Sequence, residues 1–265
     1  MKISKAQYEK LKETTEFKKA AALKYADNTT FLPEETKAGA SKGRYLYEDD
    51  EEKGVLKRTI VLNTYNWLDS HGDVHLTGTF GKSISERGNK IPHLHDHIFQ
   101  LDARVGKPTS FYEKEISWRE LGASKTGMTT ALFMESEVRR SYNEKVYNDY
   151  LKNEIDQHSV AMRYVKVELA INDGDEYPKE KAVWDKVIGL LGNRKQAEEQ
   201  GFFWAVSEAA LIEGSAVLLG SNELTPTLGG KTQPLKSTDV EPEPSKKDTR
   251  LLEGINKLMK TLKTT

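Results

Sequence analysis

The sequence predicts a mainly β protein with flanking helices (α+β), built around an antiparallel sheet or barrel. Segments rich in β-branched and aromatic residues recur through the middle of the chain. Two helical patterns interrupt them, without the regular alternation of strand and helix that is typical of a doubly wound parallel sheet. At 265 residues, the chain is long enough for one domain of catalytic size plus terminal appendages.

The first expected element is a helix that begins after Ser4 and runs to about Lys24. Ser4 and Gln7 have the spacing of a capping box, and several apolar residues fall loosely on one helical face. Residues 1–24 carry seven Lys and three Glu, so we expect a basic, solvated arm. Residues 27–54 mix turn-forming residues with an acidic run, which is typical of a loop. We therefore interpret residues 1–54 as a basic N-terminal helical arm and loop.

The compact domain is expected over residues 55–228. Strands are predicted at residues 59–65, 73–76, 129–134, 162–171, 202–206 and 211–219. The fourth is the clearest, because Val165, Val167, Leu169 and Ile171 alternate with other residues at the period of a half-buried strand. Helices are predicted at about 136–155 and 179–200, where apolar residues recur at spacings near four.

Two further segments are expected after residue 228. Residues 229–247 carry prolines among acidic residues, a composition typical of an extended linker. Asp248 can cap a short helix with an apolar stripe formed by Leu251, Leu252, Ile255, Leu258, Met259 and Leu262. Residues 245–265 hold six Lys or Arg and two acids. We expect a basic amphipathic C-terminal helix (248–265) that folds back on the domain or docks on another protein.

Composition argues against several classes of function. Forty Lys and Arg against 41 Asp and Glu give a net charge of −1, so nothing favours a dedicated nucleic-acid binder. No apolar run approaches the ~18 to 20 residues that span a bilayer, and the lysine-rich start has no apolar signal segment, so we expect no membrane partner. The absence of cysteine excludes disulfides, a thiol nucleophile and cysteine-ligated metals.

Histidines are concentrated in one region, since five of the six lie between positions 71 and 97. In an extended strand, His93, His95 and His97 would project from one face. Three imidazoles on one face can hold zinc, so a zinc hydrolase built on these residues is a lesser alternative. The other interpretation is that one of them is functional and its neighbours lie on the surface or in loops. Under that interpretation we expect no metal and no cofactor.

The sixth histidine, His158, directly precedes Ser159 at the start of the clearest strand. A serine that opens a strand is well placed for exposure. Its hydroxyl becomes an effective nucleophile only with a neutral imidazole in reach and a third group that orients the imidazole. From the residues alone, Ser159 is either such a nucleophile or a structural serine. His158 should project to the opposite face of the strand, so we treat it as a bystander.

Four blocks follow one another along the chain: residues 65–80 (YNWLDSHGDVHLTGTF), 91–106, 157–164 and 211–222 (LIEGSAVLLGSN). In order and separation they resemble four blocks of the prohead (capsid maturation) serine proteases of tailed phages. These are the Asp-x-x-Gly-Asp opening, the histidine block, the Ser-Val-Gly block and the Glu-Val-Ser block. The resemblance covers about residues 58–228, with Ala161 and Gly220 standing where the family favours Gly and Pro.

The resemblance implies the herpesvirus-protease (assemblin-like) fold, an antiparallel β-barrel ringed by helices. It implies that Ser159 is the nucleophile and His97 the general base, with His95 as the alternative base. Glu213 would orient the base. Glu208 lies in the same apolar run and competes for the acidic role, but the block match favours Glu213.

The implied function is a serine endopeptidase of phage capsid maturation that works through an acyl-enzyme. Its substrates would be scaffold protein, the N-terminal extension of the capsid protein, and its own chain by autoproteolysis. It would act within the viral procapsid in the host cytoplasm, and we also expect a homo-oligomer such as a dimer. The alternative from another class is a non-catalytic scaffold or head-morphogenesis protein that keeps the fold and works through its termini.

Overall fold

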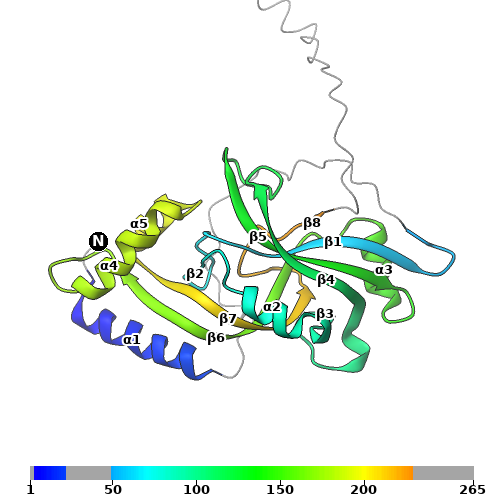
Figure 1. Ribbon diagram of the computed structural model, residues 1–265, viewed down its shortest axis with the longest axis horizontal. Helices are drawn as coiled ribbons and strands as arrows, with labels where there is room; N and C mark the ends of the chain where they lie inside the picture. Colours follow the sequence, from blue (N-terminus) through cyan, green and yellow to red (C-terminus); the bar gives the residue numbers. More distant parts are fainter. Residues whose placement is uncertain (1–2, 22–48, 229–265) are drawn as a thin grey trace, which may run out of the picture. The chain divides into compact units, whose positions relative to one another are not determined.

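The computed structural model describes residues 3–21 and 49–228 (Figure 1). The chain divides into a unit of residues 1–233 and a second unit of residues 234–265, and the described residues all belong to the first. The predicted linker and C-terminal helix, and most of the predicted loop at 27–54, lie outside the described residues. Within the described ranges, no helix has the length and apolar character needed to cross a membrane.

Helices and strands make up most of the described unit. The helices are α1 (Lys5–Ala20), α2 (Gly81–Arg87), α3 (Glu144–Leu151), α4 (Pro178–Val187) and α5 (Arg194–Gln200). The strands are β1 (Val55–Thr64), β2 (Asp73–His75), β3 (His93–His95), β4 (Arg104–Ser117), β5 (Met128–Arg139), β6 (His158–Ile171), β7 (Phe202–Ala216) and β8 (Thr227–Leu228). Short 3-10 turns lie at Gly88–Lys90, Leu101–Ala103 and Ile188–Leu190.

The eight strands form one mixed sheet. Its strands follow the order β6-β7-β3-β4-β5-β1-β8, and β2 pairs with β7 as well. The two three-residue strands, β2 and β3, run parallel to β7, while the other pairings are antiparallel. The α+β class is confirmed, but over the described ranges the sheet is not purely antiparallel and does not close into a barrel. Strands of three residues are too short to show alternation, so the sequence did not reveal their direction.

Long strands differ most from the prediction. β7 is one continuous strand, where the sequence predicted two. β4 was not predicted because charged and exposed residues dominate its 14 positions, so the apolar signal of a strand is weak. β5 extends to Arg139 and takes the first turn of the predicted helix at 136–155, which leaves α3 shorter. Sheet pairing with β1 and β4 therefore overrides the helical period there.

The predicted helix at 179–200 is broken into α4, a 3-10 turn and α5. The break lies near Gly192, where an added Cβ would come within 2.5 Å of the Trp118 ring and 2.7 Å of the Trp67 ring. Close approach of these two tryptophans requires glycine at this point, and glycine weakens a helix interior. The tertiary packing thus explains the interruption.

The N-terminal helix α1 begins as predicted, because Ser4 and Gln7 form the reciprocal capping box. It is not a solvated arm, however, since α1 packs along β6 (Figure 1). The Lys18 Nζ lies 2.6 Å from Asp73 Oδ1, and the Trp204 indole N–H donates to Thr15 Oγ1 at 2.9 Å. Most residues of this helix are charged or polar and face solvent. The sequence therefore gives no sign that Lys18 is buried against the sheet.

The main hydrophobic core lies among β1, β5, β6 and β7. Its fully buried members include Leu56, Ile60, Leu132, Met134 and Val206. Gly214 of β7 allows β1 to approach closely, because an added Cβ would come within 2.7 Å of Leu62. This packing fixes β7 against β1, and β7 carries Glu213 and Ser215 of the candidate site.

Candidate active site

The candidate site lies where strands β3 and β7 end and β6 begins. In the β6–β7 ladder, Ser159 pairs with Ser215 and Ala161 pairs with Glu213. On the other side of β7, the end of β3 pairs with Ser215 and Ala216. Directly paired residues of antiparallel strands project from the same face, so Ser159 shares a face with Ser215 and Glu213.

Glu213 is fully buried and its carboxylate accepts three hydrogen bonds. The Ala161 backbone N–H donates to Oε1 at 2.8 Å, and the Ser215 hydroxyl donates to Oε2. The third partner is His97, whose Nδ1 lies 2.5 Å from Oε1. A buried carboxylate is costly unless donors surround it, and here the donors come from two strands and one turn.

The contact with Glu213 determines what the His97 ring can do. A carboxylate that accepts from Nδ1 favours the tautomer whose Nε2 carries the lone pair. In this tautomer the imidazole can take a proton at Nε2, and the carboxylate stabilises the imidazolium that results. The pair therefore has the chemistry of a general base and its orienting acid.

A strained turn brings His97 over Glu213. Strand β3 ends at His95, and the next two residues, Asp96 and His97, have φ of 49° and 55°. The Asp96 N–H donates to the Ala216 carbonyl at 2.9 Å, and the His97 N–H donates to Ser215 Oγ at 3.2 Å. A left-handed non-glycine residue costs about 1–2 kcal/mol, and such strain concentrates at functional sites.

The three histidines of the 93–97 run do not share a face, so that prediction is wrong. His93 is buried, with Nδ1 2.9 Å from Ser136 Oγ and Nε2 3.3 Å from the Tyr150 hydroxyl. His95 lies near the surface beside Asp96, and His97 turns to Glu213. The strand ends before His97, so the alternation that the prediction assumed does not continue. Over residues 3–21 and 49–228, no group of three or more His, Cys, Asp or Glu side chains is arranged to hold a metal.

The neighbour of the candidate nucleophile, His158, faces away from the candidate site. It is fully buried, with Nε2 2.8 Å from the Tyr150 hydroxyl and Nδ1 2.9 Å from the Thr225 carbonyl. Burial lowers the pKa of His158 to about 4, and it holds the pKa of His93 well below its usual value. Both rings are therefore neutral parts of the core around Tyr150.

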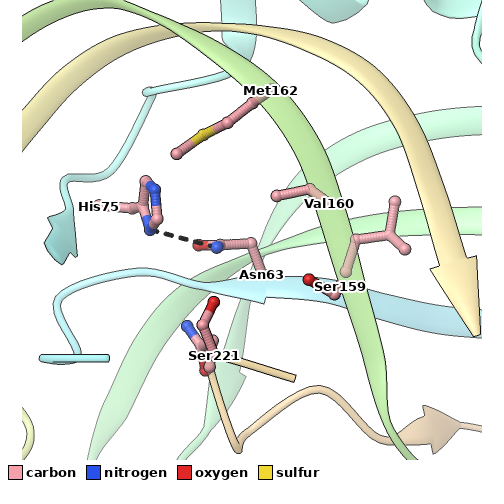
Figure 2. A pocket seen from close by; sticks show the side chains of 8 residues that line it. Asn63, His75, Ser159, Val160, Met162 and Ser221 are labelled. Carbon is pink, nitrogen blue, oxygen red and sulfur yellow. Dashed lines mark hydrogen bonds between the residues drawn. The ribbon is translucent and has the colours of Figure 1, made fainter. Parts of the chain in front are cut away.

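Ser159 is only 5% exposed, so the expectation that a serine at the start of a strand is exposed is wrong. Its side chain instead borders a small pocket (Figure 2). The pocket is lined by Leu62, Asn63, His75, Ser159, Val160, Met162, Ser221 and Asn222. In Figure 2 the Asn63 amide points toward the His75 ring, to which it is hydrogen-bonded. Among the described residues the Ser159 hydroxyl makes no hydrogen bond to His97. Catalytic hydrogen bonds often tighten only when substrate binds.

The structure thus brings together two of the three predicted site residues, His97 and Glu213, and sets Ser159 on the neighbouring strand. Glu208, which competed for the acidic role, instead faces Lys166 Nζ at 2.6 Å and Lys82 Nζ at 3.6 Å near the surface. His95 is close to the site but its ring pairs with Asp96 rather than with Glu213.

Sequence reasoning missed two features of the site. Ser215 holds the carboxylate, and the Glu-x-Ser spacing on a strand would have indicated a shared face. Asn63 and His75 line the pocket beside Ser159, with Asn63 Nδ2 3.2 Å from His75 Nδ1. No local signal could have found them, since they reach Ser159 only through the crossing of distant strands.

Comparison of the chain with protein-family models, with curated proteins and with solved structures gives no match. The geometry of β3, β6 and β7 and the sequence blocks that these strands carry are therefore the indications of function.

Proposed function

We propose that this protein is a serine endopeptidase of phage capsid maturation, with Ser159 as nucleophile, His97 as general base and Glu213 as the acid that orients the base. The hydrogen bond between His97 Nδ1 and Glu213 Oε1, 2.5 Å long, carries the proposal. It joins residues 116 positions apart in the chain, beside the strand position of Ser159. Two groups that the family resemblance selected independently are thus in contact.

The proposed mechanism is acyl transfer. His97 Nε2 takes the proton of the Ser159 hydroxyl while Oγ attacks the scissile carbonyl carbon. The tetrahedral intermediate collapses with cleavage of the C–N bond, and the imidazolium returns the proton to the leaving amine. Water, activated by His97, then releases the acyl group from Ser159. Proton transfer of this kind contributes about 10²- to 10⁴-fold to the rate.

We also propose a relation between the observed sheet and the assemblin-like barrel. β1 and β6 contact each other without pairing, so the sheet curls until its two sides meet around the core. We interpret this curled, open sheet as a variant of the assemblin-like barrel, in which closure by hydrogen bonds is incomplete. Ser159 then lies where the two sides of the sheet approach.

The biological setting of the proposal comes from the family resemblance. The substrates are scaffold protein, the N-terminal extension of the capsid protein and the enzyme itself, inside the procapsid in the host cytoplasm. We also propose that the protein forms a homo-oligomer such as a dimer. If Ser159 does not act as a nucleophile, the alternative function is that of a non-catalytic head-morphogenesis protein.

Labelling with a fluorophosphonate tests the nucleophile directly, because this reagent forms a covalent bond only with an activated serine hydroxyl. We expect mass spectrometry to find the label on Ser159. Ser159→Ala should abolish it, and His97→Ala should slow it by about 10²-fold or more. Ser110→Ala, at an exposed position of β4, is the matched control and should label normally.

Two results would contradict the proposal. One is an unlabelled wild-type protein, and the other is a label that persists in Ser159→Ala. Coexpression with scaffold and capsid protein then separates the two classes of function. A protease loses processing in Ser159→Ala, whereas a scaffold is indifferent to that change.

A further inference from the structure

Two loops that adjoin the candidate active site carry an unusual share of exposed apolar side chains. Nine large apolar residues are exposed in the described part of the chain, and five of these belong to the two loops. We name these five the apolar rim: Ile98, Phe99, Leu101, Leu218 and Leu219. Single exposed apolar residues are ordinary, but a cluster marks an interaction site.

The loops leave the sheet side by side. The last residue of β3, His95, pairs with the last residue of β7, Ala216, and the Asp96 N–H donates to the Ala216 carbonyl. The second loop then passes the start of β6, where the Val217 N–H donates to the Gln157 carbonyl at 3.1 Å. The rim therefore begins directly after His97 on one side and runs past the strand start that carries Ser159 on the other.

The exposed fractions of two rim leucines show that these side chains contribute little to the stability of the fold. Leu101 is 82% exposed and Leu218 is 87% exposed. A leucine gains free energy only when its apolar surface leaves water, so these two side chains contribute little to the core. Binding residues are commonly held on loops by a rigid scaffold, and here β3 and β7 are that scaffold.

We propose that the apolar rim binds the substrate polypeptide through apolar side chains on either side of the scissile bond. This inference rests on the proposed peptidase function and names its substrate class. The occupant is an extended peptide because the rim is continuous with the catalytic residues. The residues that directly follow His97 and Ala216 flank the start of β6, so a chain whose carbonyl lies at Ser159 is within their reach.

The experiment uses the full chain, two rim variants and a matched control. The rim variants are Leu101→Asp and the double variant Leu218→Asp/Leu219→Asp. The control is Leu190→Asp, at a position that is 55% exposed in a 3-10 turn after α4. Each protein is incubated with a peptide library prepared from a bacterial proteome, and the cut sites are identified by mass spectrometry. kcat/KM is then measured on the best-cleaved peptide.

We expect the wild-type cut sites to be enriched in Leu, Ile, Phe and Met within four residues of the scissile bond. Both rim variants should lose about tenfold or more in kcat/KM, mainly through KM, because a leucine contact in the complex is lost. Fluorophosphonate labelling of Ser159 should change less than twofold, since this small reagent does not reach the rim. Leu190→Asp should behave as wild type.

Several results would overturn the inference while the proposed function stands. One is a set of cut sites without apolar enrichment, and another is a rim variant that cleaves normally. A third is a rim variant whose oligomeric state changes in light scattering, because the rim would then bind a second copy of the chain. If removal of residues 234–265 makes cleavage tenfold faster, the apolar rim binds the chain's own C-terminal tail instead of substrate. Absence of Ser159 labelling overturns the proposed function instead.

A binding measurement tests the rim without catalysis. Fluorescein-tagged peptides of alternating Leu and Ser, or of Ser alone, are titrated with the Ser159→Ala protein, and the anisotropy is recorded. The Leu-containing peptide should bind at least tenfold more tightly, and the rim variants should remove that difference. Equal binding of the two peptides would overturn the inference, whatever the fate of the peptidase activity.

Discussion

Ser215 connects the three parts of the candidate active site. Its hydroxyl donates to Glu213 Oε2 and accepts the His97 backbone N–H, and its own strand position pairs with Ser159. It is fully buried, so water cannot replace its hydroxyl. We interpret Ser215 as a positioning residue, which acts through Glu213 and His97 rather than on substrate.

Ser215→Ala should therefore slow fluorophosphonate labelling by about tenfold or more, because a hydrogen bond to a charged group contributes about 1.5–3 kcal/mol. Ser215→Thr keeps the hydroxyl and should recover most of the rate. Proton NMR supplies a readout independent of catalysis, since the His97 Nδ1 proton bonded to a carboxylate resonates far downfield. An unchanged downfield signal in Ser215→Ala would show that the serine does not hold the pair.

The buried histidines around Tyr150 make the fold sensitive to acid. The pKa of His158 is lowered by burial to about 4, against about 6.5 in an unfolded chain. Between these values the unfolded state binds more protons, so stability falls as pH falls. The contribution is complete above about pH 6.5 and is lost by about pH 4, and it amounts to on the order of 3 kcal/mol.

Urea denaturation at several pH values checks this prediction. Wild type should lose unfolding free energy steadily from about pH 6.5 to 4. His158→Gln should be less stable at pH 7, because it loses core contacts, yet its stability should depend less on pH over this range. If the variant shows the same pH dependence as wild type, His158 is not the group responsible.

At the scale of elements, α1 is attached to the sheet through a buried charge. Lys18 is 8% exposed, and its Nζ contacts Asp73 and lies 4.4 Å from the centroid of the Trp204 ring. Asp73 is fully buried and also accepts from the Tyr164 hydroxyl. Removal of one partner from a buried ion pair leaves the other charge uncompensated.

Lys18→Met should therefore destabilise the protein by about 3 kcal/mol. Lys19→Met is the matched control, because Lys19 forms an exposed pair with Glu16 and should change stability by less than about 0.5 kcal/mol. The double variant Lys18→Met/Asp73→Asn should recover part of the loss, as expected for coupled partners. Equal midpoints for Lys18→Met and Lys19→Met in thermal denaturation would contradict the docking role of Lys18.

Elements with a strong local signal were predicted well. The capping box located the start of α1, and the alternation of apolar residues located β6. β3 carries no such signal, since its three residues are followed at once by two left-handed residues. The end of that strand depends on hydrogen bonds from β7, which lies more than a hundred residues away.

At the scale of the whole molecule, the described residues form an extensive hydrophobic core. The three hydrophobic clusters are built from residues between 3 and 228. We therefore expect removal of residues 234–265 to change the free energy of unfolding by well below about 1 kcal/mol. A chain that ends at Gln233 should then have a thermal midpoint within about 2 °C of the full chain, because so small a change shifts the midpoint of a domain this size only slightly. Ser159 labelling should also persist. A markedly lower midpoint would show that residues 234–265 pack on the core.

The sequence by itself determined the α+β class, the helix α1, the strand that Ser159 opens and a short set of candidate groups. These depend on local periodicity and capping, which each segment carries within a few residues. The block resemblance selected His97 and Glu213, but only the tertiary structure showed that these two side chains are in contact. It also decided that Ser215 supports them and that α1 is docked. The physical reason is that register between strands is set by pairing across the whole chain, and a single segment does not contain it.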